Sequence, residues 1–189
     1  MANTEKEFEA KWKNPMQKPF ISKVVVNIGI GSAGADELKK ARRVLIDLTG
    51  RKPSTTKAKK NIKEWSIRKN QAIGARVTLR KKDAEEFLKK ALVIFDNRIL
   101  RSAFDQKGNF SFGVDEHIKF PGIKYDPDLG IFGFNVSCKV ERPGHRIKYR
   151  KKNRRKVGEH HYVSKLEAMY FMEKFLNVEI VDVMEQRFY

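Results

Sequence analysis

The sequence predicts an α+β fold: a two-layer domain with a mostly antiparallel sheet, helices on one face and an open polar face on the other. Four segments predict the sheet, because they alternate between apolar and polar residues as half-buried strands do. Three segments with apolar residues at helical spacing predict the helices that cover its apolar face. We expect residues 1–189 to form a single domain with basic loops at about 57–70 and 141–160.

The predicted strands place Val, Ile, Leu, Ala or Phe at every second position, so that one face of each strand is apolar. Residues 51–58 are weakly strand-like, whereas 59–70 and 117–129 have the composition of loops. The four strands are residues 22–31, 73–80, 110–115 and 132–140.

Each predicted helix starts at a residue whose short side chain can accept a hydrogen bond from the first turn, and two of them have Glu three residues on, as in a capping box. The tail from 178 to 189 is left unassigned. The helices are expected to start at Asp36, Asp83 (with Glu86) and Ser164 (with Glu167), and to run to about Gly50, Phe95 and Leu176.

The polar face of the sheet carries amides, hydroxyls and cations and few acids. A solvated face is common in antiparallel sheets, but such a face usually mixes Glu with Lys. The shortage of acids favours a surface that faces RNA. Its residues are Asn27, Arg76, Thr78, Arg80, Ser111, Asn135, Ser137 and Lys139.

Lys and Arg number 41 against 23 Asp and Glu, a formal net charge of +18. Nearly all of the excess lies in two windows. Residues 51–70 hold eight Lys or Arg against Glu64, and residues 139–156 hold ten against Glu141. Charge runs are often only solvated surface. Here both runs are internal and interrupted by Pro, Gly or Trp, which predicts loops that bind phosphates.

Trp65 lies among the cations of the first basic loop. Two interpretations stay open. The indole either folds back to anchor the loop or stacks on an unpaired base while the cations neutralise phosphates.

Several classes of protein are disfavoured. One Cys excludes a disulfide framework and a multi-cysteine zinc site, and fits a cytoplasmic protein. No apolar run exceeds five residues, which predicts no membrane partner. The four His are scattered and are expected at the surface, whereas Cys138 is expected to be a buried structural thiol. We therefore expect no catalytic residues, metal or cofactor.

An alternative is a nucleotide-binding enzyme that uses the turn Gly29-x-Gly31-x-x-Gly34, which follows a predicted strand. Asp47, the acidic residue further along, falls inside a predicted helix instead of at the end of a second strand. A flexible strand-to-helix turn explains the glycines equally well. DNA binding is a further alternative.

Many ordered motifs resemble one known family. They include KVVVNIGIG (23–31), LTGRKP (48–53), TKAKK (56–60), IRK (67–69) and IGARVTLR (73–80), continued by NR (97–98), SAFD (102–105), GNFS (108–111), FP (120–121) and YD (125–126). Over roughly residues 14–176 they resemble the large-subunit ribosomal protein L-five family, which binds 5S rRNA. The segment ERPGHR (141–146) is similar to the archaeal branch of that family.

The resemblance implies a non-enzymatic protein of the large ribosomal subunit, cytoplasmic, that attaches 5S rRNA to 23S rRNA in the central protuberance beside other proteins. It also implies contacts to P-site tRNA from the loop at about 59–70 and to a small-subunit head protein across the subunit bridge. The family often has Gln at the position of Arg51, and the departure keeps a polar donor there. A ribosomal protein that acts elsewhere on the subunit is a further alternative.

The resemblance and the charge together give two sets of candidate residues. The rRNA set is Asn27, Arg51, Lys52, Lys57, Arg76, Thr78, Arg80, Arg142, Arg146, Lys148, Arg150, Lys151, Lys152, Arg154, Arg155 and Lys156. The tRNA set is Lys59, Lys60, Asn61, Lys63, Trp65, Arg68 and Lys69.

Overall fold

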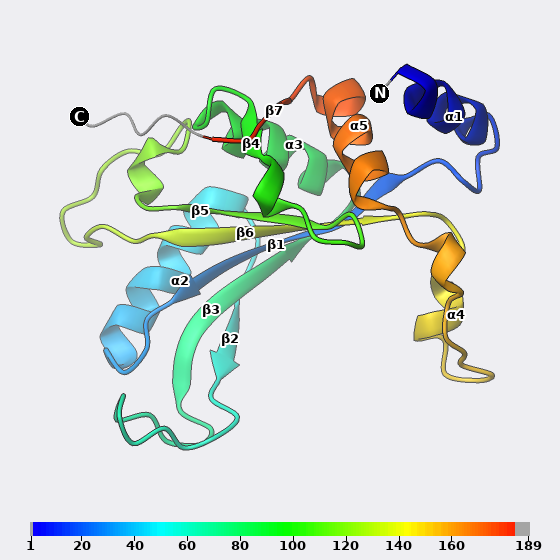
Figure 1. Ribbon diagram of the computed structural model, residues 1–189. Coiled ribbons are helices and arrows are strands. Elements are labelled where there is room, and N and C mark those ends of the chain that lie inside the picture. Colours follow the sequence, from blue (N-terminus) through cyan, green and yellow to red (C-terminus); the bar gives the residue numbers. More distant parts are fainter. Residues whose placement is uncertain (1, 184–189) are drawn as a thin grey trace. The chain divides into compact units, whose positions relative to one another are not determined.

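A computed structural model describes residues 2–183 (Figure 1). Within these residues, five strands form a sheet in the order β2-β3-β1-β6-β5, and β4 pairs in parallel with β7. The predicted α+β class with a mostly antiparallel sheet is confirmed. The elements are α1 (Ala2–Trp12), β1 (Phe20–Gly29), α2 (Ala35–Thr49), β2 (Ser54–Lys57), β3 (Ala72–Leu79), α3 (Lys81–Val93), β4 (Arg98–Leu100), η1 (Arg101–Ala103), β5 (Phe110–Val114), η2 (His117–Lys119), β6 (Phe134–Glu141), α4 (Arg146–Tyr149), η3 (Glu159–His161), α5 (Lys165–Leu176) and β7 (Glu179–Val181).

The described chain divides into two compact units. We call Val24–Ile94 with Phe112–Ser137 the central unit. We call the described residues of Met1–Lys23, Phe95–Ser111 and Cys138–Tyr189 the terminal unit. The first basic loop belongs to the central unit, whereas the second basic segment belongs to the terminal unit.

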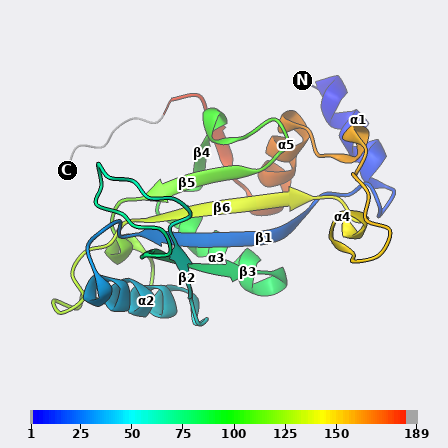
Figure 2. The ribbon, with the colours of Figure 1, turned by 90° about the horizontal axis from the view of Figure 1, so that it is seen from below.

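The alternation of β1 and β3 produces the apolar face of the central unit. The two strands are antiparallel, with Val24 opposite Leu79 and Val26 opposite Val77. All four side chains are buried, which leaves the residues between them on the other face. Helix α2 packs against β3 through an apolar stripe that includes Leu45, and Figure 2 shows α2 running beside these strands.

Helix α3 completes the core of the central unit through an aromatic cluster. Phe87 stacks on Phe120 with ring centroids 5.2 Å apart, and Phe120 meets Phe134 of β6 edge-on at 6.3 Å. Aromatic pairs at these separations add stabilisation beyond the apolar area that they bury.

Two predicted helix caps are wrong. Helix α2 starts at Ala35, because Gly34 takes the cap position with a φ of 103°. Helix α3 starts at Lys81 after Arg80, so that Asp83 lies in its first turn instead of capping it. A carboxylate in the first turn still favours the helix, since it faces the positive end of the helix dipole.

The terminal unit is built on the contact between α1 and α5. The ring centroid of Trp12 lies 5.3 Å from that of Tyr170. It lies 6.1 Å from that of Phe171, which it meets edge-on. Tyr170 Oη donates a hydrogen bond to Glu9 at 2.6 Å. Ser164 caps α5 as predicted, since its Oγ accepts a hydrogen bond from the backbone N–H of Glu167 at 3.3 Å. Helix α1 and the β4–β7 pair have no counterpart among the predicted elements.

Candidate nucleic-acid interface

Of the seven predicted rRNA residues of the central unit, Asn27 and Lys57 lie outside and the other five line one groove of about 440 Å³. We call it the sheet groove. It is open to solvent, and its polar lining combines cations with hydroxyls, as expected for a surface that binds a phosphate backbone. Its lining residues are Arg51, Lys52, Ser54, Arg76, Val77, Thr78, Leu79, Arg80 and Asp83.

Strand pairing explains why distant parts of the sequence meet in the sheet groove. Ser54 of β2 lies opposite Arg76 of β3, and its Oγ donates to the Arg76 carbonyl at 3.3 Å. Arg76 and Thr78 are exposed because they alternate with buried residues of β3. On the other side, Asn27 of β1 lies opposite Arg76 and is half-buried. One face therefore presents an amide, two hydroxyls and a guanidinium in register.

Arg51 is held at this groove by an ion pair with Asp83. The Arg51 Nε and Nη2 atoms lie 3.1 and 2.6 Å from the same oxygen, Asp83 Oδ2. This contact joins the loop after α2 to the first turn of α3. Lys52, Arg76 and Arg80 form no ion pair with any described residue, so their charges are left for an external anion. The groove therefore keeps a positive excess.

The segment from Ala58 to Gln71, which we call the β2–β3 loop, is folded. Its ends are joined by backbone bonds from Ala58 N to Gln71 O at 2.8 Å and from Asn70 N to Ala58 O at 2.9 Å. Further out, Ile62 and Ile67 pair as an isolated bridge. Ile67 is buried and anchors the loop.

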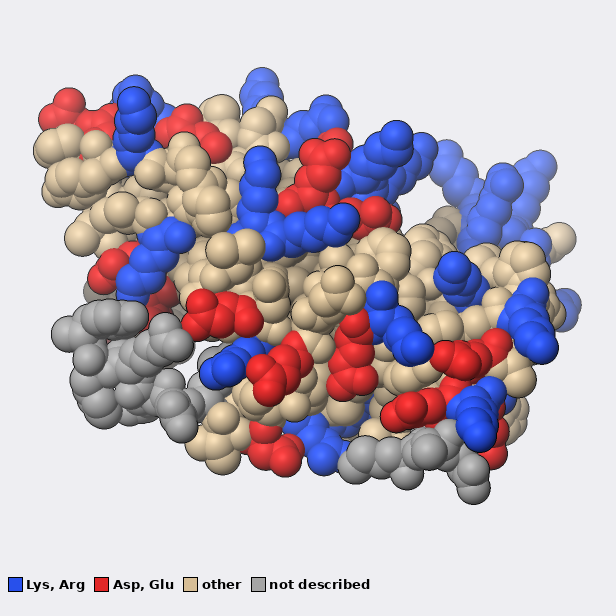
Figure 3. Space-filling view, turned by 90° about the horizontal axis from the view of Figure 1, so that it is seen from above, with Lys and Arg blue, Asp and Glu red and all other residues tan. Residues whose placement is uncertain are grey.

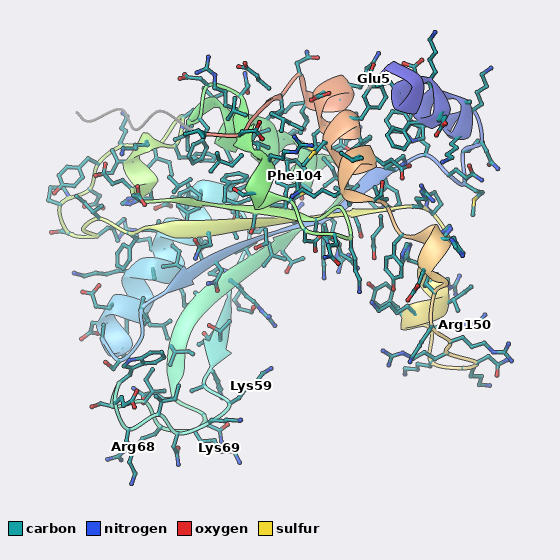
Figure 4. The ribbon with its side chains drawn as sticks, in the orientation of Figure 1. Glu5, Lys59, Arg68, Lys69, Phe104 and Arg150 are labelled. Carbon is teal, nitrogen blue, oxygen red and sulfur yellow. The ribbon has the colours of Figure 1, made fainter. Side chains whose placement is uncertain are left out.

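Trp65 lies at the turn of this loop with 64% of its surface exposed. The interpretation that it folds back as an anchor is therefore wrong, and Ile67 has that role. The loop cations also point outward: Figure 4 shows Lys59, Arg68 and Lys69 projecting away from the strands. Among the predicted tRNA residues, Asn61 stabilises the loop itself, since its Oδ1 accepts a hydrogen bond from the Lys69 backbone N–H at 2.6 Å.

The second basic segment, residues 141–160, we call the basic arm. Its start is tied to β6 by a polar cluster. Lys139 forms an ion pair with Glu141, and its Nζ donates to Tyr149 Oη at 2.7 Å. Burial would raise the pKa of Glu141, but hydrogen bonds from Lys139 and Ser22 outweigh it and hold that pKa below its ordinary value. Tyr149 belongs to α4, so this cluster fixes the helix against the strand.

Arg142 lies under the basic arm instead of on its surface. Its guanidinium pairs with the buried carboxylate of Glu167 and also donates to the carbonyl of His160 at 3.2 Å. Only 11% of the Arg142 side chain is exposed. Its charge is already compensated within the fold, and we therefore leave Arg142 out of the proposed contact surface.

Beyond α4 the basic arm turns back on itself. Arg155 N donates to Ile147 O at 3.3 Å, and Arg150 Nε donates to Asn153 O at 2.8 Å. Figure 4 shows Arg150 on the segment that follows α4. Within the described residues, none of the arm cations from 146 to 156 forms an ion pair. These cations are Arg146, Lys148, Arg150, Lys151, Lys152, Arg154, Arg155 and Lys156.

The other cations of the terminal unit are arranged differently. Figure 3 looks from above, the side on which α5, β4 and β7 lie in Figure 1, and shows acidic and basic side chains interspersed. Ion pairs on this unit include Arg98 with Glu179 and Lys174 with Glu9. Compensated charge is what a solvated surface shows, in contrast to the basic arm.

The glycine turn does not have the topology of a dinucleotide site. In that fold the strands before and after the first helix are parallel neighbours. Here β3 lies between β1 and β2 and runs antiparallel to both. Asp47 is exposed on α2. This topology excludes a dinucleotide site of that kind at the glycine turn, and with it the alternative of a nucleotide-binding enzyme that uses this turn.

Among the described residues, the titratable side chains outside these surfaces form no catalytic arrangement. No cluster of metal-ligating residues occurs in the part of the chain that the structure describes. Cys138 is buried as predicted, and burial raises the pKa of its thiol. His117 and His145 are buried, so their predicted place at the surface is wrong. Both rings bond to nearby backbone: His117 Nδ1 accepts from Phe132 N at 3.2 Å, and His145 Nδ1 lies 2.9 Å from Arg142 O.

Sequence reasoning missed Ser54 and Asp83 as neighbours of the sheet groove, and Lys107 and Tyr162 beside the basic arm. Ser54 is the first residue of a short edge strand, and only the strand register places it opposite Arg76. No sequence signal joins Lys107 to the arm, because about 40 residues separate them. No described helix is long and apolar enough to cross a membrane.

Comparisons with known proteins show the family of the chain. Residues 14–68 match the family model described as "Ribosomal protein L5", and residues 72–171 match the model for the C-terminus of the same ribosomal family. A protein named "Large ribosomal subunit protein uL5" from Pyrobaculum aerophilum is 47% identical over 88% of this chain and 93% of its own. Proteins of that name from Sulfurisphaera tokodaii and Methanococcus vannielii are 47% and 48% identical, each over 92% of this chain and 98% of its own.

Two family models together match most of the chain, and the relatives are matched almost end to end. The relatives are named as ribosomal proteins, which confirms the expectation that the chain is not an enzyme. The chain therefore belongs to the ribosomal protein L5 family.

Proposed function

We propose that this protein is a structural constituent of the large ribosomal subunit that binds 5S rRNA through the sheet groove. The observation that carries the proposal is the convergence of Arg51, Arg76, Thr78 and Arg80 on one groove of the sheet. Hydroxyl and guanidinium groups can read base edges and 2′-hydroxyls, whereas lysines mainly follow the phosphates. The groove is therefore where we place selectivity for 5S rRNA, with Asn27 on the same face.

The basic arm is proposed to hold 23S rRNA and so to attach 5S rRNA to the rest of the subunit in the central protuberance. Its exposed cations from Arg146 to Lys156 are uncompensated within the described fold. Screening limits each charge to a range of about 8 Å at physiological salt, so the arm must lie directly on the RNA. This fits an element that follows the phosphate backbone closely.

The β2–β3 loop is proposed to contact P-site tRNA. Its exposed indole and outward cations have the chemistry of a stacking platform, in which the ring covers an unpaired base or ribose. Family resemblance is the reason for choosing tRNA, for the contact to a small-subunit head protein across the subunit bridge, and for the neighbouring proteins of the central protuberance.

The test of the main proposal is direct binding of the purified full chain. Fluorescently labelled 5S rRNA is titrated with protein and then competed with unlabelled 5S rRNA, an unrelated structured RNA of equal length, and duplex DNA. We expect 5S rRNA to compete best by at least an order of magnitude, since specific complexes of nucleic acids typically exceed non-specific ones by more than that. Equal competition by the unrelated RNA would contradict selective 5S binding, and stronger competition by DNA would favour a DNA-binding protein.

A further inference from the structure

A second hollow, which neither the sheet groove nor the β2–β3 loop includes, lies in the terminal unit. Its volume is about 900 Å³. We call it the arm hollow. One wall comes from the basic arm, and the other comes from the turn before β5 together with the segment that leads into α5. Its lining residues are Gln106, Lys107, Lys148, Arg154, Arg155, Lys156, Val157, Glu159 and Tyr162.

The lining determines the class of ligand. Five cations face the hollow against one acid, Glu159, and the apolar residues among them are Val157 and Tyr162. Sites for small metabolites are mostly apolar with a few polar groups. A lining with this excess of cations fits a polyanionic strand instead.

Lys107 provides a cation on the wall of the hollow that lies outside the basic arm. It belongs to a rigid turn, because Asp105 Oδ1 accepts from the backbone N–H groups of both Lys107 and Asn109 at 2.8 Å. Gly108, which has a φ of +72°, lets the turn approach α5 closely: a Cβ there would lie 3.0 Å from the Ala168 side chain. The backbone that carries Lys107 is therefore fixed before any ligand arrives.

The side chain of Lys107 is also directed. Its Nζ lies over the Tyr162 ring, 5.3 Å from the centroid. The ring is itself held edge-on against the buried His145, with centroids 5.5 Å apart. Such a cation–π contact orients an ammonium group without neutralising its charge. Lys107 forms no ion pair within the described residues, so the charge stays available.

We propose that the arm hollow binds the phosphodiester backbone of rRNA and that Lys107, oriented by Tyr162, is a phosphate contact that works together with Arg154, Arg155 and Lys156. The inference rests on the proposed function, since it takes rRNA as the ligand. It adds a second, rigid segment that faces the basic arm. The RNA backbone would then be bound between these two segments instead of by the arm alone.

The experiment measures the binding of the full chain to 5S rRNA and to an unrelated RNA over a salt series, for the wild type and for Lys107→Ala. A phosphate contact carries no sequence information. Lys107→Ala should therefore weaken binding to both RNAs by the same factor. The plot of log K against log salt should become less steep, with the magnitude of its negative slope reduced by about 0.7–0.9. Lys6→Ala, an exposed lysine of α1 with acidic neighbours, is the matched control and should keep the wild-type slope.

A second comparison tests whether the two walls act together. In a background with Arg154→Ala, Arg155→Ala and Lys156→Ala, RNA no longer enters the arm hollow, and adding Lys107→Ala should cost much less than it does in the wild type. Tyr162→Leu should reproduce part of the Lys107→Ala loss, whereas Tyr162→Phe, which keeps the ring, should not. Melting curves check that each variant is folded.

Two outcomes would overturn the inference: a wild-type salt slope for Lys107→Ala, or the same loss in both backgrounds. These outcomes are distinct from failure of the proposed function, which shows as equal affinity of the wild-type protein for 5S rRNA and the unrelated RNA. The salt slope stays measurable in that case.

Discussion

Arg142 and Glu167 form an ion pair beneath the basic arm, and Trp12 Nε1 donates to the second oxygen of the same carboxylate at 3.2 Å. Glu167 is 2% exposed. This single side chain therefore links three distant parts of the sequence: the helix α1, the start of the arm and α5. The base of the basic arm is built on a buried charge.

Glu167→Gln tests this link. The amide keeps the shape of the side chain but leaves the guanidinium of Arg142 buried without a counter-charge, which costs about 3–5 kcal/mol in comparable sites. We expect the free energy of unfolding, from urea denaturation, to fall by that amount. Glu7→Gln, on the exposed side of α1, is the control and should change stability by less than about 0.5 kcal/mol. Equal effects of the two variants would show that the pair is not structural.

Gly74→Ala tests the close approach of β3 to β1. A Cβ at Gly74 would lie 2.5 Å from the Ile28 carbonyl oxygen and 3.0 Å from Thr56 Oγ1, so the backbone must shift. Overpacking of this kind costs roughly 1–3 kcal/mol. A Cβ at its register partner Gly29 would meet no atom within 4 Å, and Gly29→Ala should change the unfolding free energy by less than about 1 kcal/mol. A Gly74→Ala protein as stable as Gly29→Ala would contradict the observed strand spacing.

Trp65 and Ile67 should separate binding from stability. Trp65→Ala removes an exposed ring and should leave the unfolding free energy within about 0.5 kcal/mol of the wild type, while it weakens tRNA binding by about 1–3 kcal/mol if the ring stacks. Ile67→Ala removes a buried anchor and should destabilise the chain by about 2 kcal/mol or more. The measurements are denaturation and tRNA titration. Loss of stability in Trp65→Ala would restore the anchoring interpretation.

His117 should make stability depend on pH. Burial lowers the pKa of His117 below its ordinary value of 6.5, so below that pH the unfolded chain binds more protons than the folded chain. Stability is therefore lost as pH falls through 6.5 toward the lower folded-state pKa. Protonation would also remove the acceptor that Nδ1 offers to Phe132 N.

His117→Asn keeps an acceptor in that place and does not titrate. We expect the variant to lose less stability than the wild type between about pH 7.5 and pH 5.5, measured by urea denaturation. His160→Asn, at an exposed position, is the control and should retain the wild-type difference. Identical losses for His117→Asn and the wild type would exclude His117 as the cause.

The sequence predicted the strands that carry the site, because an alternating pattern with one buried face leaves little freedom of register. Strand β3, for example, was expected over 73–80 and spans Ala72–Leu79. The caps of α2 and α3 were wrong, because a glycine with positive φ and an extended Arg80 start these helices without a side-chain bond. A cap depends on backbone geometry that residue type alone does not determine.

Helix α1 was missed although Phe8 and Trp12 stand four positions apart, the spacing of one helix face. Two aromatic residues in a polar segment are a weak signal until their partner on α5 is known. Charge counting likewise placed Arg142 among the arm cations, since Glu167 lies 25 residues away and the pair exists only in the fold. Strands β4 and β7 are three residues each and too short to show a period.

The central claim is that the sheet groove selects 5S rRNA, whereas the basic arm, which we propose lies on 23S rRNA in the subunit, binds the phosphates of any RNA. It is tested by one set of titrations, with 5S rRNA and an unrelated RNA over a salt series. The proteins are the wild type, the groove variant Thr78→Ala/Arg80→Ala and the arm variant Arg150→Ala/Lys151→Ala/Lys152→Ala.

The account predicts that the arm variant binds both RNAs more weakly by one common factor. The magnitude of its negative slope of log K against log salt should be smaller by about two to three. The groove variant should lose most of its preference for 5S rRNA over the unrelated RNA while it keeps most of the arm-dependent slope. The contrary result, a groove variant that retains the wild-type preference while the arm variant loses it, would contradict the account.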